Sequence, residues 1–343
     1  MFSSFWWNRS CAVWAWGGAI FLLSIMSIQV DFSVQMNAWN GRFYDLMQDA
    51  LKKHHEASEF WDLMKAYGIL VLKIMVVGTT SSYATRMYCF KWREMMTFEY
   101  VRYWRGCEGE IEGSSQRIQE DCYRFARIME SLGISFIRSM MTLGAFIPVL
   151  WTLGKGVKLP IVGDIDGSLV WFSIIVSVGG FIITWFVGWY LPTLEYNNQK
   201  VEAAFRKELV YGEDDKIHHA EPETLIDLFK AVKRNYHRLF LHRAYFNLWR
   251  YFYNQSISIV PYLAVGPSVF AGTVTLGVMM QISNAFGRVR GSFGFLMNNW
   301  MTITELRSIW RRLHEFERNI HYKEQKLALK QARAAEKISK DAQ

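Results

Sequence analysis

Two charged side chains stand inside an otherwise apolar stretch of the sequence. Glu130 and Arg138 fall within Ile128–Leu153, IMESLGISFIRSMMTLGAFIPVLWTL. An ionised side chain at the centre of a membrane-spanning helix costs about 2.5–3.5 kcal/mol on insertion scales, so it is expected to face a water-filled path or a partner helix. Burial favours the neutral form of a carboxyl group and a nearby arginine favours its charged form, which makes Glu130 a candidate for binding and releasing protons. The alternative is a salt bridge that only fixes the helix.

Other charged residues fit the same chemistry less directly. Glu120 and Arg117 lie one helical turn apart, a spacing that is also typical of a solvated surface pair. Arg288 and Arg290 interrupt an apolar run; they line an aqueous path, pair with Glu130 across helices, or mark a helix break at the membrane interface. Three further glutamates stand in a segment whose composition indicates an exposed surface: Glu202, Glu208 and Glu213.

The sequence offers little other chemistry. His54–His55 and His218–His219 are adjacent pairs in polar segments and lack the helical spacing of metal ligands, so no metal site is expected. The four cysteines include no C-x-x-C pair, and nothing resembles a nucleophile with its base. We therefore expect no enzyme and no cofactor, with protons as the coupling ion.

Composition and hydropathy indicate a membrane protein. The 343 residues are 51% hydrophobic and 16% aromatic, with 15 Trp and 24 Phe, which is seldom seen in a soluble chain of this length. A spanning helix needs about 20 mostly apolar residues. Six segments are candidates, with Gly272–Thr275 (GTVT) as the turn between the last two: Ala12–Val30, Ala66–Met87, Ile128–Leu153, Ser168–Leu191, Tyr251–Phe270 and Leu276–Ile303.

The distribution of positive charges predicts how these spans are oriented across the membrane. Lys and Arg cluster in Thr85–Arg127, in Pro192–Arg250 and after Arg307, whereas Lys155–Gly167 and Ala271–Thr275 contain few. The positive-inside rule then places both termini and two long helical excursions in the cytosol, and it explains the net charge of +8 better than nucleic-acid binding does.

The segments outside the spans are also expected to be largely helical. Asp31–Lys65 is expected to be an outward loop with one helical piece, and Leu194–Asp215 to prolong the fourth span as a single rod. We divide the chain into a transmembrane transporter domain, 1–322, and a charged helical C-terminal tail, 323–343.

The source of energy is constrained by a missing motif. The 343 residues contain no G-x-x-x-x-G-K-[ST] phosphate-binding loop. Only 26 residues follow Glu317, too few for a nucleotide-binding domain, so we expect that the chain does not hydrolyse ATP by itself. An ion gradient or a separate ATPase must then drive it.

Several motifs, in this order along the chain, resemble those of one transporter family: NAWNGRFYDLMQ, QRIQED, RFARIMESLGISF, LEYNNQKVEAAFRKELVYGEDD, GTVTLGVMMQISNAFGRVRGSF and WMTITELRSIWRRLHEFE. Over about residues 34–318 the chain is similar to the SbmA/BacA peptide-uptake transporters of Gram-negative inner membranes. The resemblance implies that Glu120, Glu130, Glu202 and Glu213 match that family's acidic ladder along its cavity. It also implies that Arg117 matches the arginine of its QR-x-QED motif.

The expected fold is an all-α membrane protein with an ABC-exporter-like bundle of about six spans, long cytosolic helical extensions and no nucleotide-binding domain. The resemblance implies a homodimer in the bacterial inner membrane that imports antimicrobial and other peptides by alternating access. Protonation of cavity glutamates would drive this import. Two alternatives remain: the membrane subunit of an ABC-type transporter that uses a separate ATPase, and an envelope-maintenance protein that transports nothing.

Overall fold

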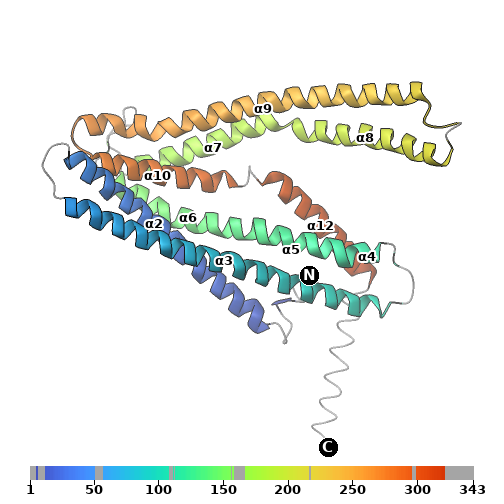
Figure 1. Ribbon diagram of the computed structural model, residues 1–343, viewed down its shortest axis with the longest axis horizontal. Helices are drawn as coiled ribbons and strands as arrows, with labels where there is room; N and C mark the ends of the chain where they lie inside the picture. The colour runs from blue at the N-terminus through green and yellow to red at the C-terminus, as the bar shows by residue number, and fades with distance from the viewer. Residues whose placement is uncertain are drawn as a thin grey trace, which may run out of the picture. The chain divides into compact units, whose positions relative to one another are not determined.

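The computed structural model describes residues 5–6, 12–50, 57–107, 111, 113–155, 157, 167–215, 218–295 and 299–320. Within these ranges the backbone is helical apart from short turns and contains no strand, which confirms the predicted all-α fold (Figure 1). The chain divides into two compact units. Unit 1 comprises Met1–Val149 and Leu276–Gln343, and unit 2 comprises Leu150–Thr275.

Unit 1 draws its helices from both ends of the chain. The N-terminal part gives the π-helical turn η1 (Val13–Gly17), α2 (Gly18–Ala50) and α3 (Ala57–Trp104). A rod that runs from Ser114 to Leu153 is assembled from α4 (Ser114–Gln116), η2 (Arg117–Asp121), α5 (Cys122–Ile128), η3 (Met129–Gly133) and α6 (Ile134–Leu153). The C-terminal part adds α10 (Leu276–Phe293) and α12 (Trp300–Asn319).

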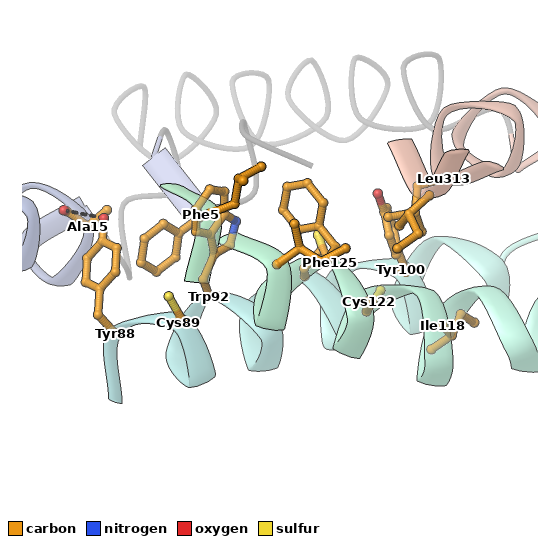
Figure 2. Packing of buried hydrophobic residues seen from close by; sticks show 14 of the residues in the cluster. Phe5, Ala15, Tyr88, Cys89, Trp92, Tyr100, Ile118, Cys122, Phe125 and Leu313 are labelled. Carbon is orange, nitrogen blue, oxygen red and sulfur yellow. Dashed lines mark hydrogen bonds between the residues drawn. The ribbon is translucent and has the colours of Figure 1, made fainter. Parts of the chain in front are cut away.

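Aromatic residues of α3 form the centre of the unit 1 core (Figure 2). Four buried side chains recur every four residues and therefore share one face of the helix: Tyr88, Trp92, Met96 and Tyr100. The Trp92 ring stacks on Phe5 at 5.4 Å and meets Phe125 of α5 edge-on at 5.5 Å. The Tyr88 hydroxyl donates a hydrogen bond of 3.1 Å to the Ala15 carbonyl. This face of α3 thus joins η1 and the Ser114–Leu153 rod in one core.

Two side chains of α2 cap the first turn of α10. Oδ1 of Asp45 accepts a hydrogen bond of 2.9 Å from the Gly277 N–H, and Oε1 of Gln48 accepts one of 2.8 Å from the Leu276 N–H. No carbonyl of the same helix can accept the N–H groups of a first turn. The two backbones lie so close that a Cβ on Gly277 would collide with the Gly41 carbonyl. An element more than 200 residues away in sequence therefore supplies the N-terminal cap of α10.

Unit 2 consists of α7 (Ser168–Gly188), α8 (Leu191–Asp214) and α9 (Pro222–Phe270), with α8 packed along α9 (Figure 1). Arg243 of α9 forms a 2.7 Å ion pair with Glu195 of α8. Nε1 of Trp249 donates a 3.1 Å hydrogen bond to Oγ1 of Thr184 in α7. Side chains thus fix the register of α9 against both partner helices.

Three described helices are long and apolar enough to cross a membrane: Val13–Ala50, Ser114–Leu153 and Ser168–Asp214. They contain the third and fourth predicted spans and, from Val13 onward, the first. The predicted spans Ala66–Met87 and Tyr251–Phe270 lie inside the longer α3 and α9, which also carry many polar residues. The turn at Gly272–Thr275 is confirmed, because α9 ends at Phe270 and Gly272 adopts a φ of +73°.

Two predicted boundaries were wrong. The sixth span was expected to continue to Ile303, but α10 ends at Phe293 and α12 begins only at Trp300. Gly291 and Gly294 bracket this end, and glycine is a poor helix former. The helical piece expected within Asp31–Lys65, at Asn37–Leu51, is confirmed as far as Ala50, but no loop separates it from the first span, because both belong to α2. Contacts such as the 5.2 Å stack of Trp39 on Phe43 stabilise this part of α2.

Helix α8 confirms that the fourth span continues beyond the apolar segment, after a two-residue turn at Trp189–Tyr190. The tail 323–343 and the pair His54–His55 lie outside the described residues.

Candidate functional site

Glu130 lies in the π-helical turn η3, directly before the apolar helix α6. Its Oε1 atom is 3.6 Å from Nε of Arg86 in α3, and the two side chains are 36% and 73% exposed. This is a loose ion pair between two partly exposed side chains. The sequence suggested Arg138, Arg288 or Arg290 as neighbours for Glu130, but the described structure pairs it with Arg86.

Both π-helical turns of the Ser114–Leu153 rod contain predicted site residues. Turn η2 contains Arg117 and Glu120, and η3 contains Glu130. Such turns are rare and frequently occur at functional sites, where the extra residue changes the direction of nearby side chains. The predicted acidic residues of this rod therefore stand where its regular hydrogen bonding is altered.

Next to Glu120 lies a carboxylate that sequence reasoning missed. Asp121 is 1% exposed. Arg312 of α12 binds it through two hydrogen bonds of 3.0 and 2.7 Å, and Arg117 adds a third of 2.8 Å. Asp121 precedes the apolar part of the rod. Burial alone would raise the pKa of its carboxyl group, but the hydrogen bonds from the two arginines outweigh burial and hold that pKa below its usual value.

Glu120 takes part in a second, more exposed set of contacts. It accepts hydrogen bonds of 3.0 and 2.7 Å from Arg124, and Arg124 also lies 3.6 Å from Glu305 of α12. Together these side chains line a polar pocket of about 350 Å³: Gln116, Arg117, Glu120, Asp121, Arg124 and Arg312. We call this group the rod–α12 ion cluster. It joins the polar end of the rod to α12.

The remaining predicted residues are dispersed. Glu202 is half-buried and Glu213 exposed on α8 in unit 2. Glu208 accepts a 3.1 Å hydrogen bond from the Ala220 N–H and lies 3.5 Å from Nδ1 of His219, so it stabilises the turn between α8 and α9. The predicted arginines of unit 1 lie on the rod and on α10: Arg138 and Arg288 are exposed and Arg290 is half-buried.

Only part of this site could have been found from the sequence. The pair Arg117 and Asp121 has the i,i+4 spacing of helical ion pairs, and this signal could have revealed Asp121. Arg312 lies 191 positions from Asp121, and no local pattern connects them. Among the described residues no group of three or more metal-ligating side chains is found.

Comparison with known proteins shows related membrane transport proteins. The chain is 26% identical over 318 residues to the inner membrane ABC transporter ATP-binding protein YddA of Escherichia coli, covering 87% of this chain and 56% of that protein. It is 25% identical over 284 residues to an uncharacterized ABC transporter ATP-binding protein of Synechocystis, covering 78% and 41%. It is 23% identical over 318 residues to ABC transporter D family member 2 of Arabidopsis thaliana, covering 87% and 42%.

These matches extend along most of the chain, whereas the chain spans only about half the length of the curated relatives it matches. Its all-helical architecture is that of an ABC-transporter-like membrane region. The SbmA/BacA-like family model matches residues 8–321. The chain therefore belongs to the SbmA/BacA-like family of membrane transporters.

Proposed function

We propose that this protein imports antimicrobial and other peptides across the bacterial inner membrane, driven by the proton gradient. Two copies would enclose a polar cavity that opens alternately to either side. The observation that carries the proposal is the position of Glu130, a partly exposed carboxylate in a π-helical turn at the start of an apolar helix. Family membership supports the transporter class.

The contact between Glu130 and Arg86 provides a mechanism for coupling. The charged carboxylate attracts the guanidinium across 3.6 Å, and protonation removes this attraction. Turn η3 could then shift against α3 at this contact, while the packing of Trp92 on Phe125 holds the rod and α3 together. A proton that enters from the acidic side and leaves in the cytosol would thus break and restore the contact once in each cycle.

The energy of one proton is sufficient for useful accumulation. One elementary charge that crosses 100 mV releases about 2.3 kcal/mol, which corresponds to about a 50-fold concentration ratio. We assign further proton-binding or cavity-lining roles to Glu120, Glu202 and Glu213. We assign cavity-lining roles to four arginines of unit 1: Arg117, Arg138, Arg288 and Arg290. The contacts of Glu208 in the α8–α9 turn favour a structural role for this residue.

Uptake into ATP-free proteoliposomes tests the coupling directly. With the outside acidified, the wild type is expected to accumulate labelled peptide. Glu130→Gln keeps the shape of the side chain but cannot release a proton. If Glu130 carries the proton, peptide accumulation driven by a gradient of 100 mV should be about 50-fold lower in this variant than in the wild type. The control is Glu223→Gln, at an exposed position of α9, which should accumulate peptide like the wild type.

Two other results would contradict this proposal, and the first would establish a different function. The curated relatives from E. coli and Synechocystis have names that specify ATP-binding proteins. This observation favours a second candidate, a membrane subunit energised by an ATPase. Peptide uptake that ignores the pH gradient but requires ATP and a partner would establish that candidate. If Glu130→Gln cells stay as sensitive to toxic peptides as wild-type cells, while the variant is inserted and folded, proton-coupled import through Glu130 is refuted.

A further inference from the structure

One face of α9 is strongly basic and lies next to an exposed apolar face of the same helix. The basic residues follow the i, i+3, i+4, i+7, i+8 spacing of a single helix face, and all are exposed: Lys230, Lys233, Arg234, His237 and Arg238. A hollow of about 560 Å³ lies along them and also touches Tyr236 and Phe240. The buried Val232 and Leu239 lie on another face of the helix.

Most of this positive charge is unneutralised within the described part of the chain. Lys230 forms a 2.8 Å ion pair with Asp227. Lys233, Arg234 and Arg238 have no carboxylate partner among the described residues. The face therefore suits a ligand with negative charge.

The same stripe continues toward the membrane as exposed apolar side chains. Leu241, Tyr245 and Leu248 follow at intervals of four and three residues, and they are 45%, 64% and 68% exposed. An acidic soluble protein would leave these side chains uncovered, whereas a lipid presents a charged headgroup beside its apolar chains. The change from basic to apolar along one stripe therefore favours a lipid as the occupant.

Contacts with α7 and α8 place the basic residues near the membrane surface. Trp249 is hydrogen-bonded to Thr184 within the apolar α7, and Arg243 pairs with Glu195 just beyond it. At about 1.5 Å per residue, Glu195 lies about 6 Å beyond Leu191, where the predicted fourth span ends, so Arg238 lies roughly 13 Å outside that end. Its long side chain can reach back toward the headgroups. Headgroups occupy about 5–8 Å on each side of the hydrocarbon core. Arg234 lies roughly one further helical turn from the membrane. Its long side chain can extend toward the headgroups, and the electrostatic attraction of their phosphates still acts at this distance.

From these observations we propose that the face formed by Lys233, Arg234, His237 and Arg238 binds the phosphate headgroups of anionic phospholipids in the cytosolic leaflet. Clusters of Lys and Arg next to a membrane helix bind anionic lipid in this way. The bound lipid would hold the α8–α9 hairpin at the membrane surface. This assignment holds whether or not transport is driven by protons.

Native mass spectrometry of the full chain in neutral detergent tests the proposal. The purified protein is mixed with phosphatidylglycerol or phosphatidylcholine, and bound lipids are counted. The wild type should retain phosphatidylglycerol in preference to phosphatidylcholine. Arg234→Gln/Arg238→Gln should weaken phosphatidylglycerol binding by about 30-fold at low salt, at about 1 kcal/mol per arginine. Arg234→Lys/Arg238→Lys should keep most of the binding, because the charge is preserved.

The matched control is Arg102→Gln/Arg105→Gln, which removes two exposed arginines from the end of α3 and its following turn. It should leave phosphatidylglycerol binding unchanged. Equal losses in both glutamine variants, or equal binding of both lipids, would overturn the proposal. The proposal would also be overturned if inorganic phosphate displaced more phosphatidylglycerol than chloride does at the same ionic strength. That result would indicate a soluble phosphate ligand. A changed oligomeric state with unchanged lipid binding would instead assign the face to a second copy of the chain.

Discussion

Replacing Asp121 by alanine is expected to lower the free energy of unfolding by about 3 kcal/mol. Removing one partner of a buried ion pair typically costs 3–5 kcal/mol because an uncompensated charge remains. The lower end applies here, because the side chains of Arg312 and Arg117 are 32% and 26% exposed and water can partly solvate them. The loss concerns the attachment of α12 to the rod, to which Arg312 contributes two hydrogen bonds to this carboxylate, and the local Arg117 contact within the rod.

Thermal unfolding of the detergent-solubilised protein, followed by tryptophan fluorescence, measures this effect. Glu315→Ala is the control, because Glu315 pairs with Arg311 in an exposed i,i+4 ion pair on the same α12. That change should cost at most about 0.5 kcal/mol. Adding Arg312→Ala to Asp121→Ala should recover part of the loss, since it removes the stranded charge. Equal destabilisation by Asp121→Ala and Glu315→Ala would refute the role given to the rod–α12 ion cluster.

The same carboxylate predicts a dependence of stability on acid. Because the pKa of Asp121 is lower in the folded protein than its usual value of about 3.9, its contribution to stability is complete above that value. The contribution is lost as the pH falls from there through the lower folded pKa. Asp121→Asn should therefore remove this part of the acid sensitivity, and urea unfolding at a series of pH values would detect it.

Gly277→Ala is expected to destabilise the α2–α10 contact by about 1–3 kcal/mol, the usual cost of overpacking. The added Cβ would collide with the Gly41 carbonyl and with the Asp45 side chain. A backbone carbonyl within a helix cannot rotate away as a side chain can. Helix α10 must therefore shift from α2, and this shift would strain the hydrogen bonds that cap its first turn.

Gly287→Ala is a matched control on the same helix. A Cβ at Gly287 meets nothing within 4 Å. Alanine forms helices better than glycine by about 1 kcal/mol, so this variant should be as stable as the wild type or more stable. Thermal unfolding of the two variants side by side distinguishes the effects. If Gly277→Ala proved as stable as Gly287→Ala, the close approach of α2 and α10 would be wrong.

The sequence predicts the helices well, because their signals are local. Apolar segments of about 20 residues identify the spans around Ala12–Val30 and Ser168–Leu191, and the GTVT turn separates α9 from α10 as expected. The helix over Asn37–Leu51 was predicted and is confirmed to Ala50, but its continuity with the first span was missed, because hydropathy marks only the apolar part of α2. The interruption after Phe293 was one of the alternatives left open for Arg288 and Arg290, because the sequence alone does not distinguish a helix break from a polar position within a continuous span.

The candidate site was predicted less completely, because its partners are distant in sequence. Glu120 and Arg117 do meet in one ion cluster, but its most buried member, Asp121, was overlooked beside the more familiar glutamate. The partners Arg86 and Arg312 come from other helices, and only tertiary packing selects them from the many arginines of the chain. Local spacing thus identifies candidate charges, whereas the fold decides which of them pair.

Side chains of α2, distant in sequence, accept hydrogen bonds from the first N–H groups of α10. Because Asp45 and Gln48 of α2 accept the N–H groups of Gly277 and Leu276, these two hydrogen bonds hold the start of α10 from outside the connection at Ala271–Thr275. A short epitope inserted after Thr273 should therefore leave both flanking helices intact. Antibody labelling of intact cells would then reveal on which side of the membrane this connection is displayed.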